Sequence, residues 1–144
     1  MKVNEKEVFD ILTGKISTTI NRALLRAFAQ EEVNITTEQW SVMSCLWHEE
    51  KVTQQQLCDL TLKDKPSMTR LIDNLEKNNL VFRHSHSTDR RVNLIHLTTE
   101  GANLREKVTN IVKSVVDKAL MDISENDISI SRQVLTKIIS NLDS

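Results

Sequence analysis

The most constraining feature of the sequence is an abrupt change of hydrophobic period near residue 80. Over residues 65–78 the apolar side chains recur at i, i+3, i+4 and i+7, which predicts a helix with one buried face. Residues 80–84 and 92–97 no longer follow that period and are predicted to be the two strands of an antiparallel hairpin. The linking residues 85–91 are polar and basic. This part of the chain is therefore predicted to be a helix followed directly by a hairpin.

Two helix starts of one type precede that unit. Thr36 and Thr53 each stand three residues before a glutamine, which is the capping-box spacing. The helix that follows Thr53 is short, and its Leu57 and Leu60 are expected to face inward. It ends at a turn before Pro66, whose missing N–H costs nothing in a first helical turn. A short helix, a turn, a one-sided helix and a basic hairpin have the layout of a winged helix–turn–helix.

Amphipathic helices flank this unit on both sides. Residues 5–31 place an apolar side chain every four positions, from Val8 to Phe28, and predict one long helix. Residues 104–123 and 128–142 carry wide apolar stripes and predict two more helices. The predicted fold is mainly α with a small β-hairpin, in a single domain.

Composition excludes several classes of function. The chain has only two glycines, Gly14 and Gly101, so it holds neither a P-loop nor a Rossmann fingerprint. His48-Glu49-Glu50 begins like a zinc-protease motif, but Val52 occupies the position of the second histidine ligand. We therefore predict no enzyme activity, no cofactor and no metal site. The chain has no apolar run suited to a membrane span or signal peptide, which leads us to expect a cytoplasmic protein.

Charge is concentrated in the middle of the chain. Residues 51–92 have a net charge of +3, whereas the segments before and after have net charges of −3 and −1. A basic centre often faces an anion, although a solvated basic surface is equally consistent with it. On the polar face of the 65–78 helix, Arg70 can bind guanine and Asn74 can bind adenine in a major groove. Ser67 and Thr69 suit phosphate oxygens or base edges near the helix N-terminus.

The linker between the strands adds a second kind of candidate contact. An arginine at the tip of a hairpin can enter the narrow minor groove, where the negative potential holds it. Arg90 and Arg91 are both candidates, and hairpin geometry alone does not choose between them. Asp89 is expected to orient one of these arginines, because phosphate repels a carboxylate.

Residues 36–105 resemble the MarR family of transcription regulators. The resemblance rests on the helix openings at Thr37-Glu38-Gln39-Trp40 and Thr53-Gln54-Gln55-Gln56-Leu57, on the run Lys65-Pro66-Ser67-Met68-Thr69-Arg70, and on Asp89-Arg90-Arg91 followed at fixed spacing by Leu97-Thr98-Thr99-Glu100-Gly101. One departure is Asn79, where the family usually has glycine, but asparagine tolerates the same left-handed conformation.

The resemblance implies a sequence-specific regulator of transcription that acts as a homodimer. Its helical dimerisation arms would be residues 1–35 and 104–144, and its winged helix–turn–helix residues 36–103. Within the latter, the recognition helix would span about 65–78 and the wing about 81–97. Lys65 then joins the expected contacts to double-stranded DNA, and the family signature favours Arg91 at the wing tip. The effector would be a small amphipathic or aromatic compound, and the regulator a repressor.

Two other functions remain open at this point. Cys45 and Cys58 could make the protein a thiol-based redox regulator, but neither lies near the start of the first helix, where peroxide-sensing relatives carry their reactive cysteine. Alternatively, the winged helix could bind a protein and not DNA. The sequence identifies neither the effector, nor its pocket, nor the operator, nor whether the regulator represses or activates.

Overall fold

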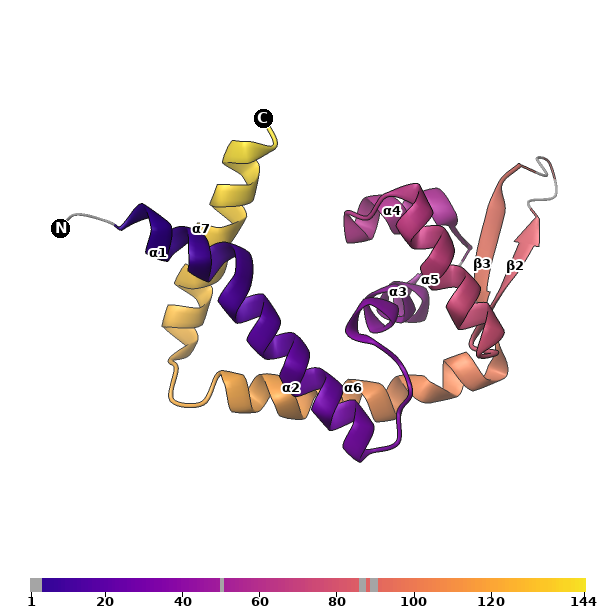
Figure 1. Ribbon diagram of the computed structural model, residues 1–144, viewed down its shortest axis with the longest axis horizontal. Helices are drawn as coiled ribbons and strands as arrows, with labels where there is room; N and C mark the ends of the chain where they lie inside the picture. Colours follow the sequence, from indigo (N-terminus) through magenta and orange to yellow (C-terminus); the bar gives the residue numbers. More distant parts are fainter. Residues whose placement is uncertain (1–3, 50, 86–87, 89–90) are drawn as a thin grey trace.

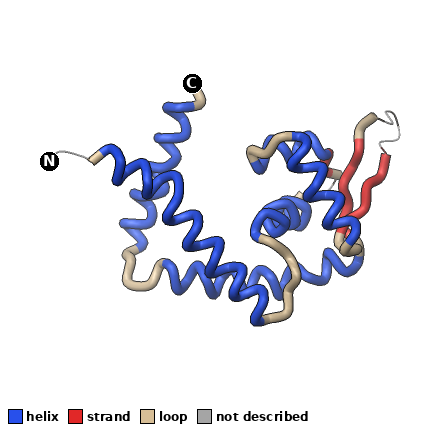
Figure 2. Tube along the Cα trace, viewed as in Figure 1, coloured by secondary structure: helices blue, strands red, loops and turns tan. Residues whose placement is uncertain are grey.

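The computed structural model describes residues 4–49, 51–85, 88 and 91–144. Its elements in chain order are α1 (Glu5–Asp10), the π-helical segment η1 (Ile11–Lys15), α2 (Ile16–Gln30), α3 (Thr37–His48), β1 (Val52–Thr53), α4 (Gln54–Thr61), α5 (Lys65–Lys77), β2 (Val81–Ser85), β3 (Asn93–Leu97), α6 (Thr99–Ala119) and α7 (Glu125–Leu142). A winged helix contains α3, α4, α5 and the sheet, while α1, η1, α2 and α7 lie on the other side of the molecule (Figure 1). Helix α6 runs from one part to the other, so the predicted boundary between residues 103 and 104 falls inside one continuous helix (Figure 2).

The predicted helix ends are confirmed by their hydrogen bonds. At the start of α3, the Gln39 backbone N–H donates to the Thr36 hydroxyl at 3.1 Å, and the Thr36 N–H donates to the Gln39 amide oxygen at 2.9 Å. The same reciprocal pair opens α4 at Thr53. After α5 the chain turns through Asn79, whose φ is 59°. These bonds satisfy backbone groups that a helix leaves unpaired at its ends.

The strands form a three-stranded antiparallel sheet in the order β1-β3-β2. The predicted hairpin is β2 and β3, which pair from Val81 opposite Leu97 to Ser85 opposite Asn93. The sequence did not indicate that β1 would join this sheet. It pairs with β3 through Val52 opposite Ile95, and so ties the start of α4 to the base of the wing.

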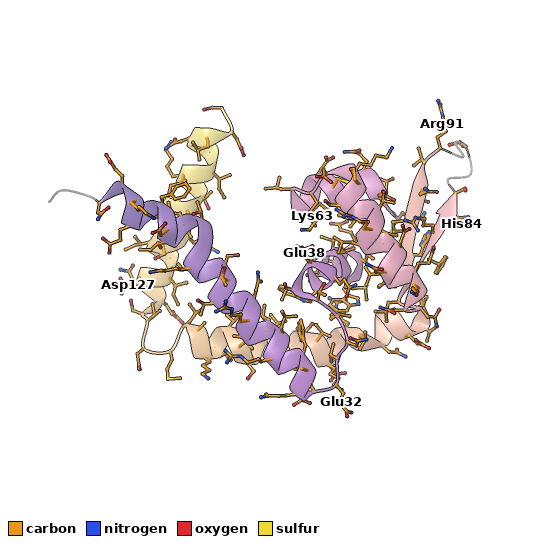
Figure 3. All side chains as sticks on the ribbon, viewed as in Figure 1. Glu32, Glu38, Lys63, His84, Arg91 and Asp127 are labelled. Carbon is orange, nitrogen blue, oxygen red and sulfur yellow. The ribbon has the colours of Figure 1, made fainter. Side chains whose placement is uncertain are left out.

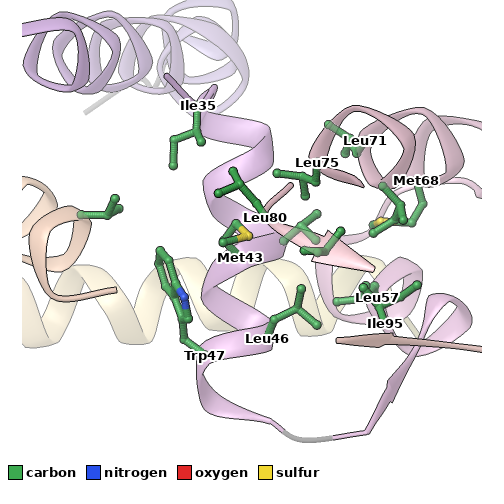
Figure 4. Close-up of a cluster of buried hydrophobic side chains, with 14 of the residues drawn as sticks. Ile35, Met43, Leu46, Trp47, Leu57, Met68, Leu71, Leu75, Leu80 and Ile95 are labelled. Carbon is green, nitrogen blue, oxygen red and sulfur yellow. The ribbon is translucent and has the colours of Figure 1, made fainter. Parts of the chain in front are cut away.

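One hydrophobic core holds the winged helix together (Figure 4). Side chains from all three of its helices and from the sheet are almost completely inaccessible to solvent, among them Met43, Leu57, Ile72 and Ile95. Burial of one such side chain stabilises the fold by about 1.5–3 kcal/mol. The core therefore holds α5 by its inward face, and the opposite face of the helix takes no part in this core.

The first turn of α6 packs tightly against the end of α5. A Cβ atom on Gly101 would lie 2.0 Å from the Leu80 carbonyl oxygen, so only glycine permits this approach. The Gly101 carbonyl also accepts a hydrogen bond of 2.9 Å from the indole N–H of Trp47. The Thr98 hydroxyl donates to the Asn79 carbonyl at 2.7 Å. These contacts join α6 firmly to the winged helix.

One prediction about the helices was wrong, and another was right in extent but not in helix type. The segment predicted as a helix over residues 5–31 is helical throughout residues 5–30, but its part Ile11–Lys15 is π-helical. An apolar residue every four positions advances about 40° beyond a full α-helical turn at each step, and the wider π turn offsets this drift. Leu60 was expected to face inward but is 61% exposed. Helix α4 turns Leu57, Cys58 and Thr61 toward the core instead, and Leu60 lies outside that arc.

The flanking helices leave much of their apolar surface uncovered. No residue of α1 or α7 is buried, and α2 buries only Leu24 and Phe28. Phe9, Val134 and Ile139 are each more than half exposed. None of the helices in the described residues is long and apolar enough to cross a membrane. We call α1, η1 and α2 the N-terminal arm, and the second half of α6 with α7 the C-terminal arm.

Candidate nucleic-acid interface

Helix α5 presents one face to the core and another to solvent. Met68, Leu71, Ile72 and Leu75 are buried and fix the rotation of the helix about its axis. Arg70 and Asn74 lie on the opposite side and are exposed. Because they are four residues apart, their side chains lie on the same stripe of the helix surface. An arginine and an asparagine on such a stripe can read base edges in a major groove.

The N-terminus of α5 is capped by Asp64, which the sequence analysis did not single out. Its carboxylate accepts a hydrogen bond of 2.8 Å from the Ser67 backbone N–H. The hydrogen bonds from the Ser67 backbone and hydroxyl, with smaller attractions from Arg70 and Lys63, hold the pKa of Asp64 below its usual value. The predicted contact Ser67 is therefore half-buried and engaged with the cap.

Thr69 faces sideways, toward the wing. Its hydroxyl accepts a hydrogen bond of 2.8 Å from the side-chain amide of Gln54, the first residue of α4. A hydroxyl that accepts one bond can still donate its own proton. Thr69 thus keeps one donor for a phosphate oxygen or a base edge, in an orientation that Gln54 fixes.

A polar cleft separates the helix–turn–helix from the wing. It has a volume of about 570 Å³. Its lining residues are Thr53, Gln54, Gln55, Cys58, Lys65, Thr69, Arg83, Arg91, Val92 and Asn93. Two predicted contacts, Lys65 and Arg91, thus border the same concavity from opposite sides. Arg83 is the third basic residue of the lining, but it forms ion pairs with Asp73 and Glu76. Lys65 and Arg91 are therefore the lining cations that can favour an anion in the cleft.

The tip of the wing is described only in part. Arg91 is exposed and lies at the outer end of the hairpin (Figure 3). Asp89 and Arg90, the predicted orienting residue and the alternative tip arginine, lie outside the described residues.

Arg83 is a residue of the interface that was not predicted from the sequence. This residue of β2 forms ion pairs with Asp73 at 2.6 Å and Glu76 at 3.2 Å, both of them on α5. One signal was present in the sequence, namely two acidic residues three apart on that helix and an arginine at an inward-facing position of the following strand.

The two thiols are poorly placed for redox chemistry. Burial raises the pKa of the half-buried Cys45 thiol, which opposes formation of the reactive thiolate. Cys58 is buried in the core. Within the described residues, no three His, Cys, Asp or Glu side chains are grouped so that they could hold a metal ion.

Comparison with known sequences shows that this chain is similar to transcription regulators. The MarR family description matches residues 35–92. The HTH-type transcriptional regulator MhqR of Bacillus subtilis is 24% identical over 128 residues, which are 89% of this chain and 87% of that protein. The organic hydroperoxide resistance transcriptional regulator of the same organism is 29% identical over 86 residues, which are 60% of this chain and 58% of that protein.

Solved structures share the fold over almost the whole chain. The complex of Staphylococcus aureus MepR with DNA has a TM-score of 0.84 at 25% identity and covers 97% of this chain and 99% of its own. A mutant of Escherichia coli MarR complexed with operator DNA has a TM-score of 0.85 at 22% identity, with coverages of 94% and 96%. Rhodococcus jostii CouR bound to p-coumaroyl-CoA has a TM-score of 0.76 at 22% identity and covers 90% of each chain.

Proposed function

The chain belongs to the MarR family of winged helix–turn–helix transcriptional regulators, and from this premise we propose that it is a repressor that binds an inverted-repeat operator as a homodimer and responds to a small ligand. The family and fold are those of DNA-binding regulators and not of enzymes. The observation that carries the proposal is the exposure of Arg70 and Asn74 on one stripe of α5, beside a cleft lined by Lys65 and Arg91.

The proposed DNA contacts divide into three groups. Arg70 and Asn74 read bases in the major groove, because they project from α5 away from the core. Lys65, Ser67 and Thr69 bind the phosphate backbone near the helix N-terminus. The wing contributes Arg91 or Arg90 to the minor groove, with Asp89 as the residue that orients it.

The arms support the proposed homodimer. Ile16, Val134 and Ile139 are each more than half exposed in the single chain, and they lie on both arms. Monomeric proteins rarely leave contiguous apolar surface of this kind in water. A second copy would cover these faces, and two copies related by a two-fold axis would present two recognition helices to an inverted repeat.

A small effector is proposed on the model of CouR, a protein of the same fold whose solved structure holds p-coumaroyl-CoA. For this chain we propose a small amphipathic or aromatic compound, bound between the arms and the winged helix. The thiol-based alternative is disfavoured by the raised pKa of Cys45 and the burial of Cys58.

Selection of bound sequences from random double-stranded DNA tests the proposal. We expect an inverted repeat whose half-site centres lie roughly 10 base pairs apart, one helical turn. Arg70→Ala should relax discrimination at one base pair of each half-site, at a cost of about 1–3 kcal/mol. Lys137→Ala, an exposed replacement on α7, is the control and should recover the wild-type sequence. Enrichment of no sequence, or only of asymmetric sites, would contradict the proposed dimeric DNA reader.

A further inference from the structure

We propose that Arg83 is a positioning residue that fixes the angle between the wing and the recognition helix. The arginines at the wing tip and the exposed stripe of α5 then meet DNA as one rigid surface. This inference rests on the proposed DNA-binding function and deepens it, because Arg83 acts through other residues and does not itself read DNA.

The sheet register directs Arg83 toward the helices. It pairs with Ile95, which is buried, and alternate residues of a strand point to opposite faces of a sheet. The side chain of Arg83 is 22% exposed, whereas its neighbour His84, on the outer face, is exposed. The guanidinium therefore lies between the sheet and α5 and not in open solvent.

Four contacts bind this one residue to α5. Its Nη2 lies 2.6 Å from Asp73 Oδ1, and its Nη1 lies 3.2 Å from Glu76 Oε1. The Arg83 backbone N–H donates to the other Glu76 oxygen, Oε2, at 2.9 Å. Nη2 also donates to the Thr69 carbonyl at 3.4 Å. Glu76 thus holds both the strand backbone and the side chain of Arg83.

The spacing of the acceptors gives these contacts their mechanical effect. Thr69, Asp73 and Glu76 stand at i, i+4 and i+7, so the guanidinium and the strand are attached along about 10 Å of the helix axis. An attachment over two turns resists tilting of the wing as well as sliding. Exposed single ion pairs usually add little, but a planar guanidinium with several fixed partners has a defined geometry.

The position of Arg83 along β2 also matters for the orientation of the wing. The next inward position toward the tip, Ser85, is exposed. Within the described residues, the Arg83 contacts are therefore the outermost attachment of β2 to α5. The same contacts supply one positive charge from the wing to the two carboxylates of Asp73 and Glu76, and so offset half of their negative charge.

A double-mutant cycle on the selected operator tests this role. We call Arg90→Ala/Arg91→Ala the tip variant and expect it to weaken binding by roughly tenfold in the wild-type background. In an Arg83→Met background the tip variant should weaken binding by less than about twofold, because an unanchored wing no longer holds its arginines in the groove. Arg83→Lys, which keeps one ion pair, should give an intermediate value.

Two further backgrounds make the outcome decisive. His84→Ala, on the outer face of the same strand, should leave the full effect of the tip variant. Asp73→Ala/Glu76→Ala should reduce that effect as Arg83→Met does, and it serves if Arg83→Met fails to fold. Equal effects of the tip variant in all backgrounds would overturn the positioning role and leave the proposed function intact. A tip variant without effect on the wild-type protein would overturn the positioning role together with the proposed wing contact. A wild-type protein that binds no DNA would refute the proposed function itself.

Discussion

The winged helix and the arms carry the same kind of amphipathic pattern in the sequence but reach opposite outcomes in the structure. In the winged helix, every inward stripe meets another within the chain, so that Met68 and Ile72 are completely buried. In the arms, equally regular stripes leave Val134 and Ile139 more than half exposed. A hydrophobic period therefore identifies a surface that must be covered, but it does not identify what covers it.

The largest effect is expected from a charge placed in the exposed apolar stripe of the C-terminal arm. Ile139→Asp should lower operator affinity by at least about 100-fold and abolish the dimer, although Ile139 contacts little of its own chain. An ordinary surface replacement changes stability by less than about 0.5 kcal/mol. Gel filtration with light scattering and DNA titration measure both effects.

Ser140→Asp is the matched control for this change, since Ser140 is exposed on the same helix. It should preserve the dimer and its affinity. A monomeric Ile139→Asp variant that binds the full operator as tightly as the wild type would show that the arms are not needed for DNA binding.

The corresponding change in the winged helix should destabilise the fold of each chain and leave the contact between chains unchanged. Ile72→Ala removes a completely buried side chain and should lower the free energy of unfolding by about 2–5 kcal/mol. The dimer should persist at temperatures where the variant is folded, because the arms are unchanged. Chemical denaturation at two protein concentrations separates the two kinds of effect. A loss below about 1 kcal/mol would mean that the core around α5 is looser than the structure indicates.

The smallest expected effect concerns Cys45. Cys45→Ser should leave operator affinity within about twofold, and hydrogen peroxide should release neither protein from DNA at concentrations that spare methionine. The reason is the raised pKa of the Cys45 thiol, which keeps it protonated and unreactive at neutral pH. Release of the wild-type protein by peroxide, together with resistance of the variant, would replace the ligand-responsive proposal by a redox one.

Features set by neighbouring residues could be predicted from the sequence. The capping boxes at Thr36 and Thr53 and the left-handed Asn79 depend on side chains within a few positions of one another. The buried face of α5 followed from its spacing alone. The π-helical segment η1 was not predicted, because the repeat of four apolar residues runs unchanged through η1 and through the α-helical α2.

Features set by contacts across the chain could not be predicted. Leu60 was placed on the wrong side because the inward arc of a helix as short as α4 depends on what packs against it. The attachment of Arg83 to α5 needs the position of β2 relative to the helix, which sequence spacing does not give. The exposed face of α5 could be predicted in part. The sequence indicated Arg70 and Asn74. The hydrogen bonds that engage Ser67 and Thr69 with neighbouring side chains could be seen only in the structure.

The close contact between Gly101 and the Leu80 carbonyl allows α6 to act as a rigid lever. The helix has 21 residues and therefore a length of about 31 Å, without a proline to bend it. Its first turn is fixed at the end of the recognition helix by Leu80, Asn79 and Trp47, and its far end belongs to the arm. A rotation of about 5° at one end displaces the other by nearly 3 Å over that length, roughly the rise of one base pair. In the proposed dimer, the arrangement of the arms would then determine the distance between the two recognition helices, although the arms lie far from any atom that touches DNA.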